Sequence, residues 1–242
     1  MIKPHKLTFF IDFDGTITKQ DVGETLIKFF GNVEEINKII QLWAEHKITS
    51  SESWQMFIDI MQDYNKQLID DIIDKIDIDP FFLEFLELTK KYNSPVIVLS
   101  DGWDYYIHKI FEKFKITIPF YSNHVEFDSY QKLKITFPHR DDECNLCGNC
   151  KRNHLLYNSS DYEDEFTIYI GDGLSDKCPA TFVDYIFAKG QLLKFLEKHR
   201  ISYYPFSNFN DIISIVNNLI SKKRLKKRHQ AILNRKKFYL EG

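Results

Sequence analysis

Two aspartates separated by one residue follow an apolar run close to the start of the chain. The run and its end read FFIDFDGT over residues 9–16. A short continuous apolar run is typical of a buried strand, and ligands of open α/β sheets bind beyond the carboxyl ends of the strands. Because side chains alternate along a strand, Asp12 and Asp14 would point apart unless the chain turns at Gly15. With that turn, one carboxylate could act as a nucleophile and the other as a proton donor; the alternative is a plain Asp-Gly turn.

Two later apolar runs end in polar residues of related chemistry. Residues 96–99 lead into SDG at 100–102 and then into a helical pattern, an arrangement that favours anion binding at a helix start. Residues 166–170 lead into GDGLSD at 171–176. The two carboxylates of that segment could bind Mg²⁺, which prefers hard oxygen ligands. Helix capping at the first of these ends and a surface turn at the second are the alternatives.

Together with a lysine at the start of a predicted helix, these segments resemble the four motifs of the haloacid dehalogenase-type (HAD) phosphatases. The motifs occur in the order Asp-x-Asp-x-Thr, strand-Ser, Lys and Gly-Asp-x-x-x-Asp, and the resemblance covers nearly the whole chain apart from its C-terminal tail. It implies a phosphomonoester hydrolase that works through an aspartyl-phosphate. Asp12 would be the nucleophile, Asp14 the acid/base and Lys151 the charge that stabilises the phosphoryl group.

The same resemblance implies two sets of ligands. The predicted Mg²⁺ ion is held by acidic residues: Asp12, Asp14 (through its backbone carbonyl), Asp172 and Asp176 (directly or through water). The predicted phosphate-binding residues follow the strands or open a helix: Thr16, Ser100, Asp101, Gly102 and Lys151.

The elements that must position these residues are strands alternating with helices. Such alternation beyond residue 94 predicts an α/β fold with a doubly wound, parallel, Rossmann-like sheet. Residues 19–79 show helical periodicity and no convincing strand, which predicts an all-helical insertion. In the HAD resemblance this insertion is a C1-type cap over a core of residues 1–18 and 80–242. Short strands at 116–121, 125–127 and 133–137 predict an antiparallel hairpin at the edge of the core.

Two groups of HAD phosphatases share further residues with this chain. YSNH at 121–124, FPH at 137–139 and CGNCK at 147–151 resemble the MtnX-type phosphatases, which dephosphorylate 2-hydroxy-3-keto-5-methylthiopentenyl-1-phosphate. The segments at 100–102 and 171–179 look closer to the phosphoethanolamine/phosphocholine phosphatases. Phosphoserine phosphatases, which share the cap type, are a more distant resemblance.

In the phosphoethanolamine/phosphocholine group, acidic side chains contact a cationic head group. The matching candidates for substrate specificity here are Asp21, Glu24 and Asp101. Asp21 and Asp101 could equally cap helices. The sequence therefore predicts a small phosphorylated metabolite and leaves its head group open.

Composition limits the class of protein further. The chain has 242 residues, 43% of them hydrophobic, and a formal net charge of −3, which gives no overall attraction to nucleic acid or anionic membrane. No apolar run approaches the length that spans a bilayer, and the N-terminus lacks the pattern of a signal peptide. We therefore expect a cytoplasmic enzyme; its oligomeric state is not predicted.

Three of the four cysteines are close together in sequence. Cys144, Cys147 and Cys150, with His154 nearby, could supply a structural Zn²⁺ site. The preferred alternative is a loop of reduced thiols that positions Lys151, because zinc sites more often pair two separated ligand clusters.

The C-terminal tail is rich in Lys and Arg over residues 221–237. A solvated terminal helix is the preferred interpretation, since the segment has no base-reading motif. Contact with nucleic acid or a membrane surface is the alternative. It would define a different class of protein, a catalytically idle phosphatase-like scaffold that binds nucleic acid, which is disfavoured because no motif residue is missing.

Overall fold

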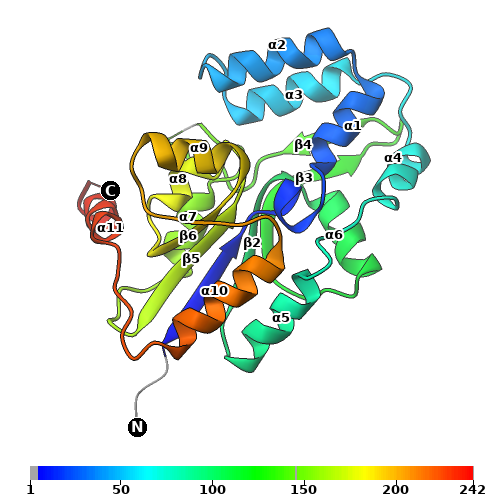
Figure 1. The fold of residues 1–242 in the computed structure, drawn as a ribbon. Helices are drawn as coiled ribbons and strands as arrows, with labels where there is room; N and C mark the ends of the chain where they lie inside the picture. Colours follow the sequence, from blue (N-terminus) through cyan, green and yellow to red (C-terminus); the bar gives the residue numbers. More distant parts are fainter. Residues whose placement is uncertain (1–4, 145, 242) are drawn as a thin grey trace. The chain divides into compact units, whose positions relative to one another are not determined.

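The computed structural model describes residues 5–144 and 146–241, shown in Figure 1. These residues belong to two compact units, neither of which is continuous in sequence. The first unit comprises Met1–Asp12, Ile78–Leu99 and Lys151–Gly242, and the second comprises Phe13–Asp77 and Ser100–Cys150.

Parallel strands form the centre of the first unit. They are β1 (Lys6–Ile11), the first half of β2 (Val96–Trp103), β5 (Glu165–Gly171), β6 (Tyr185–Ala188) and β7 (Tyr204–Pro205). β1 lies between β2 and β5, with Phe10 opposite Ile97 on one side and Tyr169 on the other. The apolar runs of β1 and β5 are buried on both faces, as expected of a parallel sheet covered by helices.

Helices of the first unit pack along these strands. Their bounds are α5 (Phe82–Lys91), α7 (Lys151–Tyr157), α8 (Lys177–Ala180), α9 (Gly190–Lys198), α10 (Phe209–Ser221) and α11 (His229–Glu241). The rings of Phe82 and Phe85 on α5 contact Phe209 on α10, with centroids 4.9 Å and 5.1 Å apart, and Phe85 also contacts Phe9 of β1. Figure 1 shows α5 with α10 and α7 with α8 and α9 as two groups of helices beside the sheet.

The basic tail is only partly solvated. Arg235 of α11 has a side chain 3% exposed, and it donates to Asp161 (2.8 Å), to the Phe182 carbonyl (2.6 Å) and, at 3.5 Å, to Asp184. Arg228 donates to carbonyls of the α8–β6 segment at 2.9 Å and 2.7 Å. These two arginines therefore hold the tail against the rest of the first unit. Lys236 and its neighbour Lys237 are exposed.

The second unit contains most of the helices that precede β2. Its elements are a sharp turn, η1 (Phe13–Ile17), α1 (Val22–Phe30), α2 (Val33–Ala44), α3 (Ser50–Ile60), α4 (Lys66–Ile73), α6 (Asp104–Lys113), the second half of β2, β3 (Phe120–Phe127) and β4 (Leu133–Thr136). Helices α1 to α4 begin at side-chain caps; for example, Asp21 accepts from Glu24 N–H, and Thr49 forms a capping box. A small apolar core lies among α1, α2 and α3, made of Ile27, Ile36, Ile39 and Phe57.

The strand order is β4-β3-β2-β1-β5-β6-β7, and β3 and β4 are antiparallel. This confirms the predicted α/β class, the parallel sheet and the hairpin at its edge. The prediction of separate strands at 116–121 and 125–127 was wrong, because residues 116–119 form no strand and β3 runs unbroken from Phe120. Lys115 adopts a positive φ of 56°, and Pro119 has no N–H to donate to a neighbouring strand. No helix among the described residues is long and apolar enough to cross a membrane.

Candidate active site

Three side chains meet beyond the carboxyl end of β1 and β5 in the first unit. Asp12 directly follows β1, and its backbone N–H donates to the Ile170 carbonyl of β5 at 2.9 Å. Lys151, the first residue of α7, is 2% exposed and donates through Nζ to Asp12 Oδ1 at 2.5 Å and to Asp176 Oδ1 at 2.7 Å. It also donates to Ser175 Oγ at 3.0 Å. The structure thus brings together three residues that lie far apart in the sequence.

Asp176 is the anchor of this cluster. Its Oδ1 accepts from Lys151 and from the hydroxyl of Tyr169, both at 2.7 Å. Its Oδ2 accepts from the backbone N–H groups of Asp172 and Gly173, both at 2.9 Å. Two donors on each oxygen fix the carboxylate, which in turn fixes the lysine and the turn that carries Asp172.

The residues of this cluster fit a divalent cation. Oxygen atoms of Asp12, Asp172 and Asp176 lie within 4.8 Å of one another. Among the described residues, these three form the one group of close side-chain atoms that could hold a metal ion. When ionised, three carboxylates beside one ammonium leave two negative charges, which a divalent cation would neutralise. Hard carboxylate oxygens suit Mg²⁺. Because Asp176 already accepts four hydrogen bonds, its arrangement favours contact with such an ion through water.

The pKa values of the cluster reflect this excess of negative charge. Burial, followed by the charge of Asp176, raises the pKa of Asp12 above its ordinary value, and Lys151 opposes the rise. Burial would also raise the pKa of Asp176, but the charge and hydrogen bonds of Lys151 outweigh it and hold that pKa below its ordinary value. Burial lowers the pKa of Lys151 less than Asp12 and Asp176 raise it, so the lysine stays charged.

A second group of predicted residues gathers around Asp14 in the second unit. The chain turns sharply here, with Gly15 at a φ of 71°. Asp14 Oδ2 accepts from Tyr106 Oη at 2.6 Å and from Ser100 Oγ at 3.2 Å, and Oδ1 accepts from the Val22 N–H at 3.0 Å. Thr16 and Ser100 are buried, with 1% and 0% of their surfaces exposed. Asp14 is therefore a carboxylate held in one orientation.

Asp101 is satisfied by protein donors. One oxygen accepts from Ser50 Oγ of α3, and the other accepts from the Asn149 N–H at 3.0 Å and from Asn123 Nδ2 at 3.4 Å. Asn149 also donates to the Ser100 carbonyl at 2.7 Å, which ties the segment before Lys151 to the end of β2. Asp101 thus has a structural role in joining three segments of the second unit.

The other two predicted specificity residues lie on the first turn of helix α1 or just before it. Asp21 is the N-cap of α1 and accepts from Glu24 N–H at 2.7 Å. The Glu24 side chain pairs with Lys28 at 2.6 Å, and both side chains are about half exposed, at 48% and 57%. Helix capping, the alternative weighed for Asp21 in the sequence, is confirmed.

The sequence did not single out Tyr106, Tyr169, Ser175 and Asn149. Both tyrosines are fully buried and sit at positions where aromatic residues are expected for packing alone. A phenol in a buried strand or helix has to find a partner for its hydroxyl, and in each case the partner is a carboxylate of the predicted site. The need of a buried phenol for a hydrogen-bond partner is the one signal that could have pointed to Tyr106 and Tyr169.

The cysteine segment gives no support to a zinc site. Cys150 is buried, Cys144 and Cys147 are intermediate, and none of the three belongs to a described group of three close metal-ligating atoms. His154 lies on α7 in the first unit, whereas the three cysteines belong to the second. The Zn²⁺ prediction therefore rests on the sequence pattern alone.

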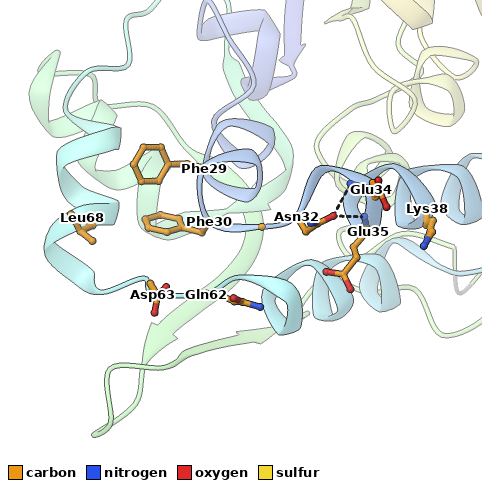
Figure 2. Close-up of a pocket in the computed structure, with 10 residues that line it drawn as sticks. Phe29, Phe30, Asn32, Glu34, Glu35, Lys38, Gln62, Asp63 and Leu68 are labelled. Atoms are coloured by element: carbon orange, nitrogen blue, oxygen red, sulfur yellow. Dashed lines mark hydrogen bonds between the residues drawn. The ribbon is translucent and has the colours of Figure 1, made fainter.

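A hollow of about 830 Å³ lies elsewhere in the second unit, beside α1, α2 and α4. Figure 2 shows Phe29, Phe30 and Leu68 on one side of it, and Glu34 and Lys38 on α2. None of the predicted catalytic, phosphate-binding or metal-binding residues lines it, so it is not the predicted phosphate site.

Comparisons with known proteins agree with this chemistry. Residues 7–190 match the family described as Putative Phosphatase (Put_Phosphatase). The 2-hydroxy-3-keto-5-methylthiopentenyl-1-phosphate phosphatase of Bacillus cereus strain B4264 is 33% identical over 208 residues, which cover 84% of this chain and 92% of that protein. The phosphatase of the same name from Brevibacillus brevis is 28% identical over 214 residues, covering 87% and 95%.

Solved structures show the same fold. A HAD family hydrolase from Salmonella enterica serovar Typhi aligns with a TM-score of 0.70 and 20% identity, over 91% of this chain and 73% of the other. A phosphoserine phosphatase with a phospho-aspartyl intermediate analogue aligns with a TM-score of 0.63 and 19% identity, over 89% and 99%. The chain belongs to the Put_Phosphatase family and is a phosphatase, and its fold is that of the HAD hydrolase and phosphoserine phosphatase structures.

Proposed function

We propose that this protein is a Mg²⁺-dependent phosphomonoester hydrolase in which Asp12 forms an aspartyl-phosphate. The observation that carries the proposal is the buried contact of Lys151 with Asp12 at 2.5 Å, beside Asp172 and Asp176. A lysine in this position neutralises both the nucleophile and the phosphoryl group that it receives. Mg²⁺, bound by Asp12, the Asp14 carbonyl and Asp172 with Asp176 nearby, would supply further charge neutralisation on the phosphate oxygens.

Asp14 is proposed as the acid/base of the same reaction, with Thr16, Ser100 and Gly102 as phosphate-binding residues. The fixed orientation of the Asp14 carboxylate, which accepts from Tyr106, Ser100 and the Val22 N–H, supports its role. In the first step Asp12 attacks phosphorus while Asp14 protonates the leaving oxygen. In the second step Asp14 takes a proton from the water that hydrolyses the aspartyl-phosphate.

The helical segment 19–79 is proposed as the cap that provides substrate specificity and excludes water. Four helices, α1 to α4, lie within it, in keeping with the all-helical insertion that the sequence predicts. We also propose, as expected from the sequence, that the protein acts in the cytoplasm.

The substrate proposed is a ketopentenyl phosphate of the kind named for the relatives, 2-hydroxy-3-keto-5-methylthiopentenyl-1-phosphate. Both oxygens of Asp101 accept hydrogen bonds from Ser50, Asn123 and Asn149, and Asp21 caps a helix. Two of the three acidic candidates for a cationic head group are thus engaged in structural contacts. This favours a substrate without an amine over phosphoethanolamine, phosphocholine or phosphoserine.

A panel of phosphate esters tests this proposal. Wild-type protein should hydrolyse the ketopentenyl phosphate with Mg²⁺, lose that activity in a chelator and regain it when Mg²⁺ is restored. Asp12→Asn should abolish turnover while the thermal midpoint of unfolding shows that the chain is still folded. Normal Mg²⁺-dependent turnover by Asp12→Asn would overturn the covalent step, and a preference for phosphoethanolamine would overturn the substrate assignment alone.

A further inference from the structure

The two oxygens of the Asp14 carboxylate have different surroundings. Oδ2 accepts two side-chain hydroxyls, from Tyr106 at 2.6 Å and from Ser100 at 3.2 Å. Oδ1 accepts the backbone N–H of Val22 at 3.0 Å. Two hydroxyl donors stabilise negative charge or carbonyl character on Oδ2, so a proton added to this carboxyl group is favoured on Oδ1. The shorter of the two hydroxyl contacts comes from the tyrosine.

Packing holds Tyr106 in place for this contact. Its ring is fully buried and stacks on Phe13, with centroids 5.9 Å apart, and Trp103 lies beside it at 6.0 Å. A Cβ at Gly102 would lie 1.6 Å from the Tyr106 hydroxyl and 2.6 Å from Asp14 Oδ2. Glycine, which has no Cβ, therefore provides the space in which Tyr106 and Asp14 form their hydrogen bond.

The burial of the phenol also suits a donor. The Tyr106 side chain is fully buried, and its hydroxyl lies 2.6 Å from Asp14 Oδ2. A neutral buried phenol needs an acceptor, and Asp14 Oδ2 provides it.

We propose that Tyr106 is a positioning residue that makes Oδ1 of Asp14 the oxygen that delivers and receives the catalytic proton. The inference rests on the proposed function, because it assigns an atom and a supporting residue to its acid/base step. In the first half-reaction the Oδ1 proton moves to the ester oxygen as the bond from that oxygen to phosphorus breaks and the bond from Asp12 to phosphorus forms. In the second, Oδ1 takes a proton from water as the water oxygen bonds to phosphorus and the bond from Asp12 breaks, which restores both side chains.

Leaving groups of different acidity test this role. We would measure kcat/KM of wild-type protein, Tyr106→Phe and Asp14→Asn with Mg²⁺, using 2,4-dinitrophenyl phosphate and phenyl phosphate. The dinitrophenolate ion departs without a proton, whereas the more basic phenolate benefits from general-acid assistance. Tyr105→Phe is a matched control, because Tyr105 lies on the same helix and its hydroxyl donates to a different carboxylate, Asp70, at 2.5 Å.

We expect Tyr106→Phe to lower kcat/KM for phenyl phosphate on the order of tenfold more than for the dinitrophenyl ester, since it removes one hydrogen bond to a charged group. Asp14→Asn should show the same selectivity to a greater degree, and Tyr105→Phe should show none. Equal losses on both esters, or an unchanged ratio, would overturn the role of Tyr106 and leave the proposed function standing. A wild-type protein that hydrolyses the dinitrophenyl ester and not phenyl phosphate would overturn the acid step itself, in the proposed function as well as in this inference.

Discussion

Replacing Asp176 by asparagine should be strongly destabilising, although the two side chains have nearly the same shape. Each carboxylate oxygen accepts two donors: Lys151 and Tyr169 on one, and the N–H groups of Asp172 and Gly173 on the other. An amide has one acceptor oxygen, so in either orientation its NH₂ group faces two donors. Two buried donors at about 1–3 kcal/mol each predict a loss of about 2–6 kcal/mol in the free energy of unfolding.

Urea denaturation of the metal-free protein measures this loss. Tyr169→Phe removes a single donor from the same carboxylate and should cost about 1 kcal/mol. Asp59→Asn, at an exposed carboxylate that accepts from Gln55 at 2.9 Å, is the control and should stay within about 0.5 kcal/mol of wild type. A loss below about 1 kcal/mol for Asp176→Asn, or an equal loss for Tyr169→Phe, would refute the view that this carboxylate is held by all four donors.

Two further substitutions probe other contacts. Arg235→Met should lower the free energy of unfolding by about 3–5 kcal/mol, because it removes the guanidinium that pairs with buried Asp184. Lys236→Met, at the exposed neighbouring position, should change it little, and equal effects in urea denaturation would contradict the buried pair. Gly102→Ala should lower stability by about 1–3 kcal/mol, because its Cβ would overlap the Tyr106 hydroxyl, and a variant with wild-type melting temperature would show that the ring can move aside.

The fold could be predicted well wherever local pattern and tertiary structure agree. Buried runs of apolar residues identified β1, β2 and β5, and the helix cap considered for Asp21 lies at the start of α1. The error at 116–121 arose because the consecutive β-branched residues at 116–118 resemble a strand, whereas a strand also requires a partner for its N–H groups. The short α8 and β7 were missed because elements of four and two residues have too few positions to show a period.

The chemical site was predicted in part. Motif spacing placed Asp12 and Asp176 together, because residues at the ends of adjacent parallel strands must lie near one another, and the HAD resemblance added Lys151 at the start of a helix. The support given by Tyr106 and Tyr169 could not be predicted, since the direction of a hydroxyl depends on how the ring packs. The same holds for Asp101, whose carboxylate is satisfied by donors from residues about fifty positions away in both directions.

The pairing of β1 with β5 has a consequence for how the chain is made. Lys6 pairs with Glu165, 159 residues later in the sequence, so β1 leaves the ribosome well before β5. Until β5 is synthesised, one edge of this apolar strand has no native neighbour, and unpaired strand edges promote association with other chains. Contacts of such large sequence separation slow folding. The strand that leads to the proposed nucleophile is therefore open to association with other chains until β5 is made, and chaperones would protect it during that interval.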